Sequence, residues 1–217
     1  MKIAHHVDHS TLMSFAAGSL PEALGAVVAT HISVCSQCRG ELRALECVGS
    51  AILGSLPPAS LTKIAPSAPD VDGSIRIDEG DHVLAAIERS GDVPAPLSRF
   101  VGSDLSGVRW KRLGLGVWHH PIELSDASRG DLRLLKISPG QVMPEHGHGG
   151  TELTMVLAGS YQDECGVFGI GDVADLDDQV HKPVADRTTG CICLIASEQK
   201  ARFKGTFARL FQPLTGM

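Results

Sequence analysis

The chain has 217 residues, 43% of them hydrophobic, and a formal net charge of -6 at pH 7. This size and hydrophobic content allow one large core or two modest ones. The negative charge argues against nucleic acid as a direct partner, because nucleic-acid-binding proteins neutralise phosphates with clustered Lys and Arg side chains.

No stretch of the chain has the uninterrupted apolar length that spans a bilayer, and the first ten residues, MKIAHHVDHS, lead into no such stretch. We therefore expect a soluble, cytoplasmic protein without membrane contact. The cysteines are too sparse for a disulfide scaffold, and in a reducing cytosol we expect metal ligands, redox thiols or buried apolar groups. They are Cys35, Cys38, Cys47, Cys165, Cys191 and Cys193.

The first part of the chain has the pattern of a small helical domain. Residues 11–56 alternate apolar and small polar residues at helical spacing, interrupted by Gly and Pro, which predicts two or three short helices. Residues 57–78 are rich in Pro, Ala and Ser and predict a flexible connector. Residues 79–90 regain an apolar helical stripe, which predicts an amphipathic helix that docks either on this chain or on a partner.

The remainder of the chain changes to short apolar segments after a second Pro-containing linker at residues 91–99. The segments RLLKIS, TELTMVLAG and CICLIAS are separated by Gly, Pro and Asp clusters, a pattern typical of an all-β sandwich or barrel. The predicted fold class is therefore α + β in two domains, with an all-α domain over residues 1–90 and an all-β domain over residues 100–217.

A potential metal site stands out in the helical part. His31, Cys35 and Cys38 are spaced as i, i+4 and i+7, so one helical face would bring them to a single ion. Two thiolates and an imidazole suit zinc, and a closed structural site requires a fourth ligand. The histidine-rich start offers three candidates, of which His6 is preferred over His5 and His9. The alternative is a Cys-x-x-Cys redox pair or two unligated thiols.

A second potential metal site lies in the β part. His146 and His148 are one residue apart, so they point from one face of a strand, and Glu152 follows four residues later. If Glu152 opens the next strand, its carboxylate can turn toward both imidazoles, and His181 is the best candidate for a third histidine. A set of three histidines and one carboxylate accepts zinc, manganese, iron or nickel.

Other histidines and cysteines of the β part are predicted to have no role at a metal. Cys191 and Cys193 share one face of the strand-like CICLIAS run and are expected to be small apolar groups in a barrel wall. His119 and His120 precede a proline and are expected to be solvent-exposed loop residues.

The segment from Gly140 to Gly159 resembles the first cupin motif, because Gly, His-x-His, Glu and Gly stand at the spacing of that motif. The second cupin motif matches less well, since Gly171 lies ten residues before His181 where the usual pattern has eleven. With the start HHVDHSTLMSFAAGSLPEALGAVVATHISVCSQCRGEL, nearly the whole chain is similar to the ChrR-type anti-sigma factors, in which a zinc-binding anti-sigma domain precedes a cupin.

This resemblance implies a double-stranded β-helix (jelly-roll) barrel, two metal sites and a protein partner. It assigns zinc to His6, His31, Cys35 and Cys38, and the cupin metal to His146, His148, Glu152 and His181. It also implies that the amino-terminal helices bind an extracytoplasmic-function sigma factor in a 1:1 complex and block its access to RNA polymerase core. The cupin would sense singlet oxygen or organic hydroperoxide, so the protein would regulate transcription in an oxidative stress response.

Two other functions are weighed against this one. A cupin metal with open coordination positions is also the centre of dioxygenases and isomerases, so the alternative is a metal-dependent cupin enzyme; no separate acid–base constellation accompanies the ligands. A DNA-binding zinc module is disfavoured, because Arg39 and Arg43 are the only close basic pair around the first site. Sigma release by oxidation of the metal-bound thiolates, or by chemistry at the cupin followed by proteolysis, remains open.

Overall fold

The computed structural model describes residues 3–59, 93–126, 128, 130–144, 146–147, 150–176, 182–198 and 202–203. The helix predicted over residues 79–90, and nearly all of the connector predicted over residues 57–78, lie outside these ranges. Helices come first along the chain and antiparallel strands follow, in the order that the sequence predicts.

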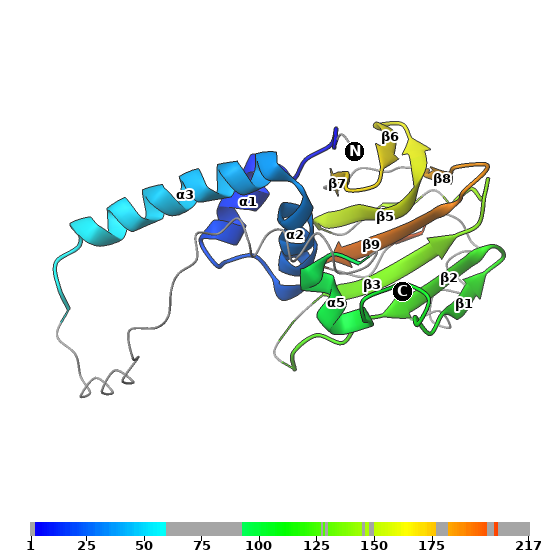
Figure 1. Ribbon diagram of the computed structural model, residues 1–217, viewed down its shortest axis with the longest axis horizontal. Helices are drawn as coiled ribbons and strands as arrows, with labels where there is room; N and C mark the ends of the chain where they lie inside the picture. Colours follow the sequence, from blue (N-terminus) through cyan, green and yellow to red (C-terminus); the bar gives the residue numbers. More distant parts are fainter. Residues whose placement is uncertain are drawn as a thin grey trace.

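Three helices form the amino-terminal part (Figure 1): α1 (His9–Ala16), α2 (Glu22–Val34) and α3 (Ser36–Ser55). The Asp8 carboxylate caps α1 by accepting a hydrogen bond from the backbone N–H of Ser10. The middle helix, α2, packs against α1 and α3 on one side and against the sheet on the other. No helix in the described part of the chain is both long and apolar enough to cross a membrane.

The third helix is longer than the sequence analysis expected, and its second half extends away from the rest of the protein (Figure 1). Near its start, Cys38 and Leu42 are buried. The same face continues toward the end of the helix, where Val48, Ile52 and Leu56 are each 59% exposed. Helical periodicity therefore gives α3 one apolar stripe that is covered at its base and uncovered toward its tip within the described structure.

A further helix, α5 (Ala95–Val101), lies in the segment that the sequence analysis assigned to a linker. Pro94 is its N-cap and Pro96 is in its first turn, where the missing N–H of proline removes no intrahelical hydrogen bond. Leu97 is buried, and α5 packs on α2. The prolines there begin a helix, whereas the sequence analysis took them only as signs of a linker.

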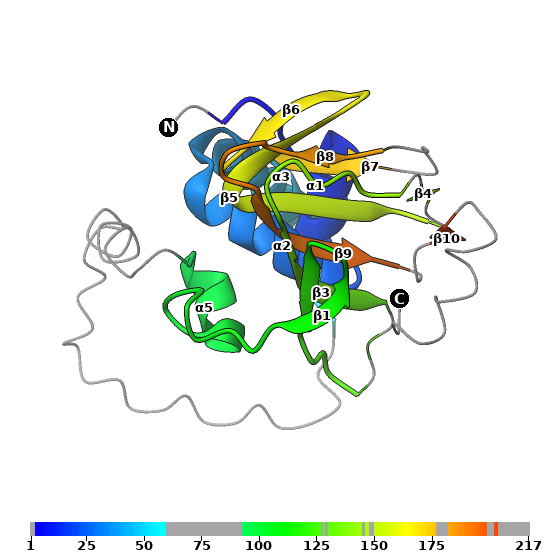
Figure 2. The ribbon, with the colours of Figure 1, turned by 90° about the vertical axis from the view of Figure 1, so that its right-hand side faces the viewer.

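The strands form two antiparallel sheets (Figure 2). The larger sheet has the order β1-β2-β3-β9-β5-β6, and β7 and β8 also pair with β5, which is the longest strand. Its strands are β1 (Lys111–Gly114), β2 (Val117–Pro121), β3 (Asp131–Ile137), β5 (Glu152–Asp163), β6 (Gly166–Gly169), β7 (Val173–Leu176), β8 (Val184–Ala185) and β9 (Cys191–Ser197). The smaller sheet pairs β4 (His146–Gly147) with β10 (Arg202–Phe203).

The two faces of the larger sheet belong to two separate cores. On one face, Leu134, Leu153 and Leu194 are fully buried in a cluster that also contains Leu24 and Val28 of α2. The opposite face carries a second cluster of its own, which includes Val156, Tyr161 and the two cysteines of β9. Alternation along the strands assigns successive side chains to the two cores. The helical part and the sheet are thus joined by shared buried apolar surface.

Gly159 provides a stability test of β5. Its backbone is left-handed, with φ of +69°, and an added Cβ would lie 2.0 Å from the carbonyl oxygen of Gly190. We expect Gly159→Ala to lower the free energy of unfolding by about 3 kcal/mol, from the strained backbone and the overlap together. Gly140→Ala is the matched control, with φ of +68° but no atom within 3.9 Å of the new Cβ, and should cost about 1 kcal/mol. Urea unfolding measures both, and equal losses would contradict the overlap argument.

Candidate metal centre

Four side chains of the amino-terminal part converge on one point. One ligand atom from each of His6, His31, Cys35 and Cys38 lies within 4.8 Å of the corresponding atoms of the other three. These are the four residues that the sequence analysis assigned to zinc. Within the described residues, they form the group of His, Cys, Asp and Glu side chains that could hold a metal ion.

The two cysteines lie at the junction of α2 and α3. His31 is in the last turn of α2, Cys35 has an extended backbone that separates the helices, and Cys38 is in the first turn of α3. The prediction of one continuous helical face was therefore wrong, although the spacing still brings the ligands together. The break makes Cys35 the N-cap of α3, where its Sγ accepts a hydrogen bond from Cys38 N–H at 3.5 Å.

His31 is fully buried and held in one tautomer. Its Nδ1 lies 2.9 Å from the carbonyl oxygen of Gly171, which can only accept, so Nδ1 carries the proton. The deprotonated Nε2 faces the site, 3.2 Å from Cys38 Sγ. Burial, more than any other cause, lowers the pKa of His31 to about 4. The imidazole is therefore neutral at pH 7, as metal ligation requires.

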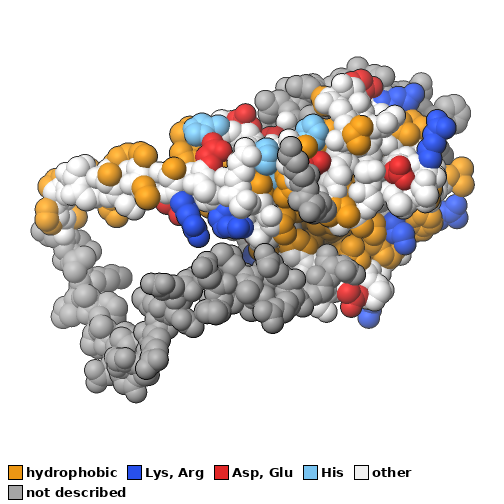
Figure 3. Space-filling model, turned by 45° about the horizontal axis from the view of Figure 1, so that its top comes forward, with side chains coloured by type: hydrophobic (Ala, Val, Ile, Leu, Met, Phe, Trp, Pro, Cys, Tyr) orange, Lys and Arg blue, Asp and Glu red, His pale blue; other side chains and the backbone are white. Residues whose placement is uncertain are grey.

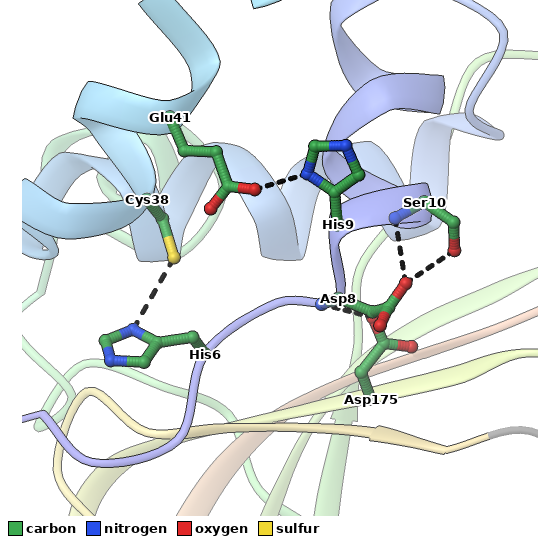
Figure 4. A network of polar contacts seen from close by, with 7 residues as sticks. All are labelled: His6, Asp8, His9, Ser10, Cys38, Glu41 and Asp175. Atoms are coloured by element: carbon green, nitrogen blue, oxygen red, sulfur yellow. Dashed lines mark hydrogen bonds and ion pairs between the residues drawn. The ribbon is translucent and has the colours of Figure 1, made fainter. Parts of the chain in front are cut away.

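His6 reaches the site from the segment that precedes α1. Its Nδ1 lies 3.4 Å from Cys35 Sγ and 3.5 Å from Cys38 Sγ. Figure 4 shows the His6 ring turned toward Cys38, with the extended segment passing between α3 and the sheet. His6 thus closes the open side of the site that the helix junction leaves.

The other two amino-terminal histidines are engaged elsewhere. His9 donates a hydrogen bond from Nδ1 to the carboxylate of Glu41 on α3 (Figure 4). The His5 ring packs on Phe168 with their centroids 4.2 Å apart, and its Nε2–H donates to the Val167 carbonyl oxygen at 3.1 Å. The choice of His6 over these two rested on no local signal in the sequence, and the fold supplies the reason for it.

The donor set fits a divalent cation of the zinc type. Two thiols and two imidazoles match the ligands and the number of a closed tetrahedral zinc site. Burial, followed by the effect of Cys35, raises the pKa of the Cys38 thiol to about 12. A cation is needed to favour a thiolate at that position, and zinc would supply charge stabilisation and a fixed geometry.

The predicted barrel site is described only at one of its four residues. Glu152 is the first residue of β5, as the sequence analysis required, and its buried carboxylate accepts a hydrogen bond from Thr154 Oγ1 at 3.2 Å. The backbone of His146 lies in β4, but its side chain, His148 and His181 lie outside the described residues. The four-ligand barrel set stays a prediction.

His119 and His120 were expected in an exposed loop, and this expectation was wrong. Both lie in β2, and His119 is only 8% exposed. Its Nδ1 accepts a hydrogen bond from Nη1 of the buried Arg133 at 3.3 Å. Arg133 in turn pairs with Asp131. Strand pairing with β3 places these groups on the sheet, a tertiary contact that no local pattern of the sequence reveals.

His119 gives the protein a pH-dependent stability. Burial, followed by the charge of Arg133, lowers the pKa of His119 below its ordinary value of 6.5. As the pH falls through 6.5, the unfolded chain takes up a proton that the folded chain does not, so stability decreases. We expect the free energy of unfolding to fall more steeply below pH 6.5 in the wild type than in His119→Gln. Identical slopes in urea unfolding would contradict this. Proton competition at the metal centre affects both proteins equally.

Cys191 and Cys193 are buried in the barrel wall, as the sequence analysis expected. They are 3% and 2% exposed, and their Sγ atoms are 3.2 Å apart. The hydrogen bond from Cys191, followed by burial, raises the pKa of the Cys193 thiol well above its ordinary value. Cys193 is therefore a neutral thiol at pH 7, and both cysteines belong to the second core.

Comparison with known proteins identifies the family. Residues 99–201 match the family model described as the ChrR cupin-like domain. The chain is 40% identical over 218 residues to anti-sigma-E factor ChrR of Cereibacter sphaeroides, covering 98% of this chain and 98% of that protein. The chain belongs to the ChrR family of anti-sigma factors.

A solved member of the ChrR family has the same fold over nearly the whole chain. The crystal structure of Rhodobacter sphaeroides SigE in complex with the anti-sigma ChrR matches with 38% identity and a TM-score of 0.74, covering 90% of this chain and 99% of that one. The structure of KdgF from a Halomonas species matches at 16% identity, with a TM-score of 0.37, over 42% of this chain and 87% of the KdgF chain; this similarity is too low to support a conclusion about function. The predicted fold class, a helical part followed by a cupin barrel, is confirmed.

ChrR of Cereibacter sphaeroides is an anti-sigma factor, a regulatory protein, which agrees with the predicted class of function. What the sequence analysis missed is the surroundings of the metal centre. It noted Gly171 only as part of the second cupin motif, and Asp172 not at all. The contact between His31 and Gly171 spans 140 positions of the chain, so no local pattern could have predicted it.

Proposed function

We propose that the protein binds an extracytoplasmic-function sigma factor in a 1:1 complex, keeps it from RNA polymerase core and so regulates transcription. The observation that carries this proposal is the position of the candidate metal centre at the base of α3, whose apolar stripe has exposed side chains toward its tip. Figure 3 shows apolar side chains on the part of α3 that extends from the protein. Exposed apolar side chains at helical spacing suit docking against a protein partner.

The partner class follows from the relatives. The solved ChrR is in complex with SigE, and an anti-sigma factor of Cereibacter sphaeroides is similar over 98% of this chain. We extend the sigma partner to this protein, together with a cytoplasmic location. In the same proposal, residues 1–90 are the sigma-binding zinc domain and residues 100–217 the cupin domain, and the connecting residues 91–99 include the start of helix α5.

Two metals and one signal complete the proposal. His6, His31, Cys35 and Cys38 hold zinc, and His146, His148, Glu152 and His181 hold zinc, manganese, iron or nickel in the cupin. Singlet oxygen or organic hydroperoxide releases the sigma factor, by oxidation of the zinc-bound thiolates or by chemistry at the cupin. Either route must weaken the sigma complex relative to the competing core complex, because a signal acts only through differential affinity.

Co-purification of the full chain with its candidate sigma factor, with elemental analysis of the same sample, tests this function. We expect a 1:1 complex that contains zinc at stoichiometric amounts. Exposure to singlet oxygen or to an organic hydroperoxide should then dissociate the complex. Failure to form a complex would contradict the proposal, and a complex that survives both oxidants would contradict the proposed signal.

A further inference from the structure

The segment that carries His6 is tied to the cupin at both ends. At its start, Oδ1 of Asp172 accepts hydrogen bonds from the backbone N–H groups of Ala4 and His5, at 2.7 and 3.0 Å. At its end, Oδ2 of Asp175 accepts from Asp8 N–H at 3.0 Å (Figure 4). We call residues 4–8 the strap. His6, the metal-site residue farthest in sequence from the other three, lies between its two attachment points.

The turn between β6 and β7 forms the cupin side of this contact. Asp172 is 5% exposed, and its Oδ2 accepts from Gly169 N–H at 2.8 Å. The neighbouring Gly171 has φ of +87° and donates its N–H to the Val156 carbonyl oxygen at 2.8 Å. One carboxylate therefore joins three backbone N–H groups from the strap and the turn. The turn is fixed to β5 while it holds the strap.

The same turn fixes a second residue of the metal centre. The Gly171 carbonyl oxygen accepts the Nδ1 proton of His31, which leaves Nε2 facing the two thiols. In metal sites, the group that accepts the second ring proton of a histidine sets its tautomer and orientation. Adjacent residues of the cupin thus orient both histidines, one through a carbonyl oxygen and the other through the strap.

We infer that the cupin supplies the outer shell of the zinc centre and that Asp172 is its positioning residue. Asp172 acts through the strap, since its carboxylate fixes the backbone on which His6 stands. The inference rests on the proposal that these four residues bind zinc. A change in the barrel that shifts the β6–β7 turn would move both histidines relative to the cysteines and weaken the zinc site.

An aromatic stack offers a contact between the barrel core and the strap. The Tyr161 ring is stacked on Phe168 with centroids 4.9 Å apart, and Phe168 packs on His5. Tyr161 belongs to the same buried cluster as Cys191 and Cys193, and its buried hydroxyl has no hydrogen-bond partner among the described residues. Movement of the Tyr161 ring would therefore displace Phe168 and, through it, His5, the residue next to His6.

The test is the affinity and the spectrum of cobalt bound by the reduced full-length chain. Cobalt bound by thiolates has a characteristic absorption, and Cys35→Ala/Cys38→Ala defines the background from any other site. We expect Asp172→Ala to weaken cobalt binding about 10-fold to 100-fold, the usual cost of losing an outer-shell partner. It should also speed zinc transfer to a chelator and alkylation of Cys35 and Cys38. Asp172→Asn, whose amide oxygen can still accept from the strap, should lose less.

Two further variants serve as a control and as a second test of the strap. Asp186→Ala is the matched control, because that carboxylate also accepts backbone N–H groups of the cupin, from Thr188 and Thr189, but none of the hydrogen bonds described for it reaches the strap. If Asp172→Ala does not fold, Asp175→Ala detaches the other end of the strap and should weaken cobalt binding in the same direction. Cobalt affinity and spectrum that match those of Asp186→Ala would overturn the inference, as would a wild type without thiolate-bound cobalt.

Sigma binding, measured on the same samples, separates this inference from the proposed function. A wild type that binds cobalt through its thiolates but no sigma factor would contradict the proposed function alone. Weaker cobalt binding by Asp172→Ala in that sample would still support the positioning role of Asp172.

Discussion

Cys38→Ala is expected to remove zinc from the metal centre and to abolish sigma binding together. Cys38 is fully buried and lies in the first turn of α3, and its Sγ contacts His6 and His31 of the site. A structural zinc contributes about 10 kcal/mol or more to the folding of small zinc domains, and three remaining ligands leave a site incomplete. We expect the affinity for the sigma factor to fall at least about 100-fold, which is about 2.7 kcal/mol. Elemental analysis and a sigma-binding titration measure the two effects.

Cys47→Ala is the matched control for this variant. Cys47 is also on α3, but it is exposed and belongs to no metal group among the described residues. It should retain both zinc and sigma binding. Full sigma affinity in a zinc-free Cys38→Ala protein would show that the metal centre is not needed for sequestration.

Val48→Asp/Ile52→Asp is expected to abolish sigma binding while zinc stays bound. Both side chains are 59% exposed on the apolar stripe of α3, so the change removes no packing from the described cores. In a docked complex, each new carboxylate would lose its hydration against an apolar partner surface. Central apolar contacts of an interface are typically worth about 2 kcal/mol or more each, so we expect an affinity loss of about 100-fold or more.

Ser50→Asp provides the control on the same helix. Helical periodicity places residue 50 away from the stripe, and the residue is exposed, so the added charge should leave sigma affinity within about 3-fold of the wild type. Zinc content and the helical circular dichroism should be equal in all three proteins. An unchanged affinity of the double variant would remove α3 from the sigma interface.

The order of helices and strands could be predicted from the sequence because periodicity and turn residues are local signals. Three residues of the candidate metal centre, His31, Cys35 and Cys38, could be predicted from their ligand spacing. The histidine-rich start offered three candidates for the fourth position, and only the family resemblance favoured His6. The break of the helix at Cys35 was not predictable from spacing alone. The intervals of four residues from His31 to Cys35 and of three from Cys35 to Cys38 suit both a continuous helix and a helix junction. Helix α5 was missed because proline is read as a breaker although it also begins helices.

Long-range pairing explains the remaining differences. His119 is buried because β2 pairs with β3, which brings Arg133 to it. Asp172 holds the strap across 168 positions of the chain. Contacts of this kind depend on the tertiary fold, and a single sequence carries no periodic signal for them.

The junction of α2 and α3 also determines the direction in which α3 extends from the protein. α3 has 20 residues, so at 1.5 Å per residue its tip lies about 30 Å from Cys35. Because the helix is this long, a small rotation at its base becomes a large displacement at its tip: about 10° of rotation moves the tip by about 5 Å. The candidate metal ligands from α2, α3 and the strap meet at this base of α3. Loss of zinc would therefore change the orientation of the whole apolar stripe, even if α3 itself stays folded.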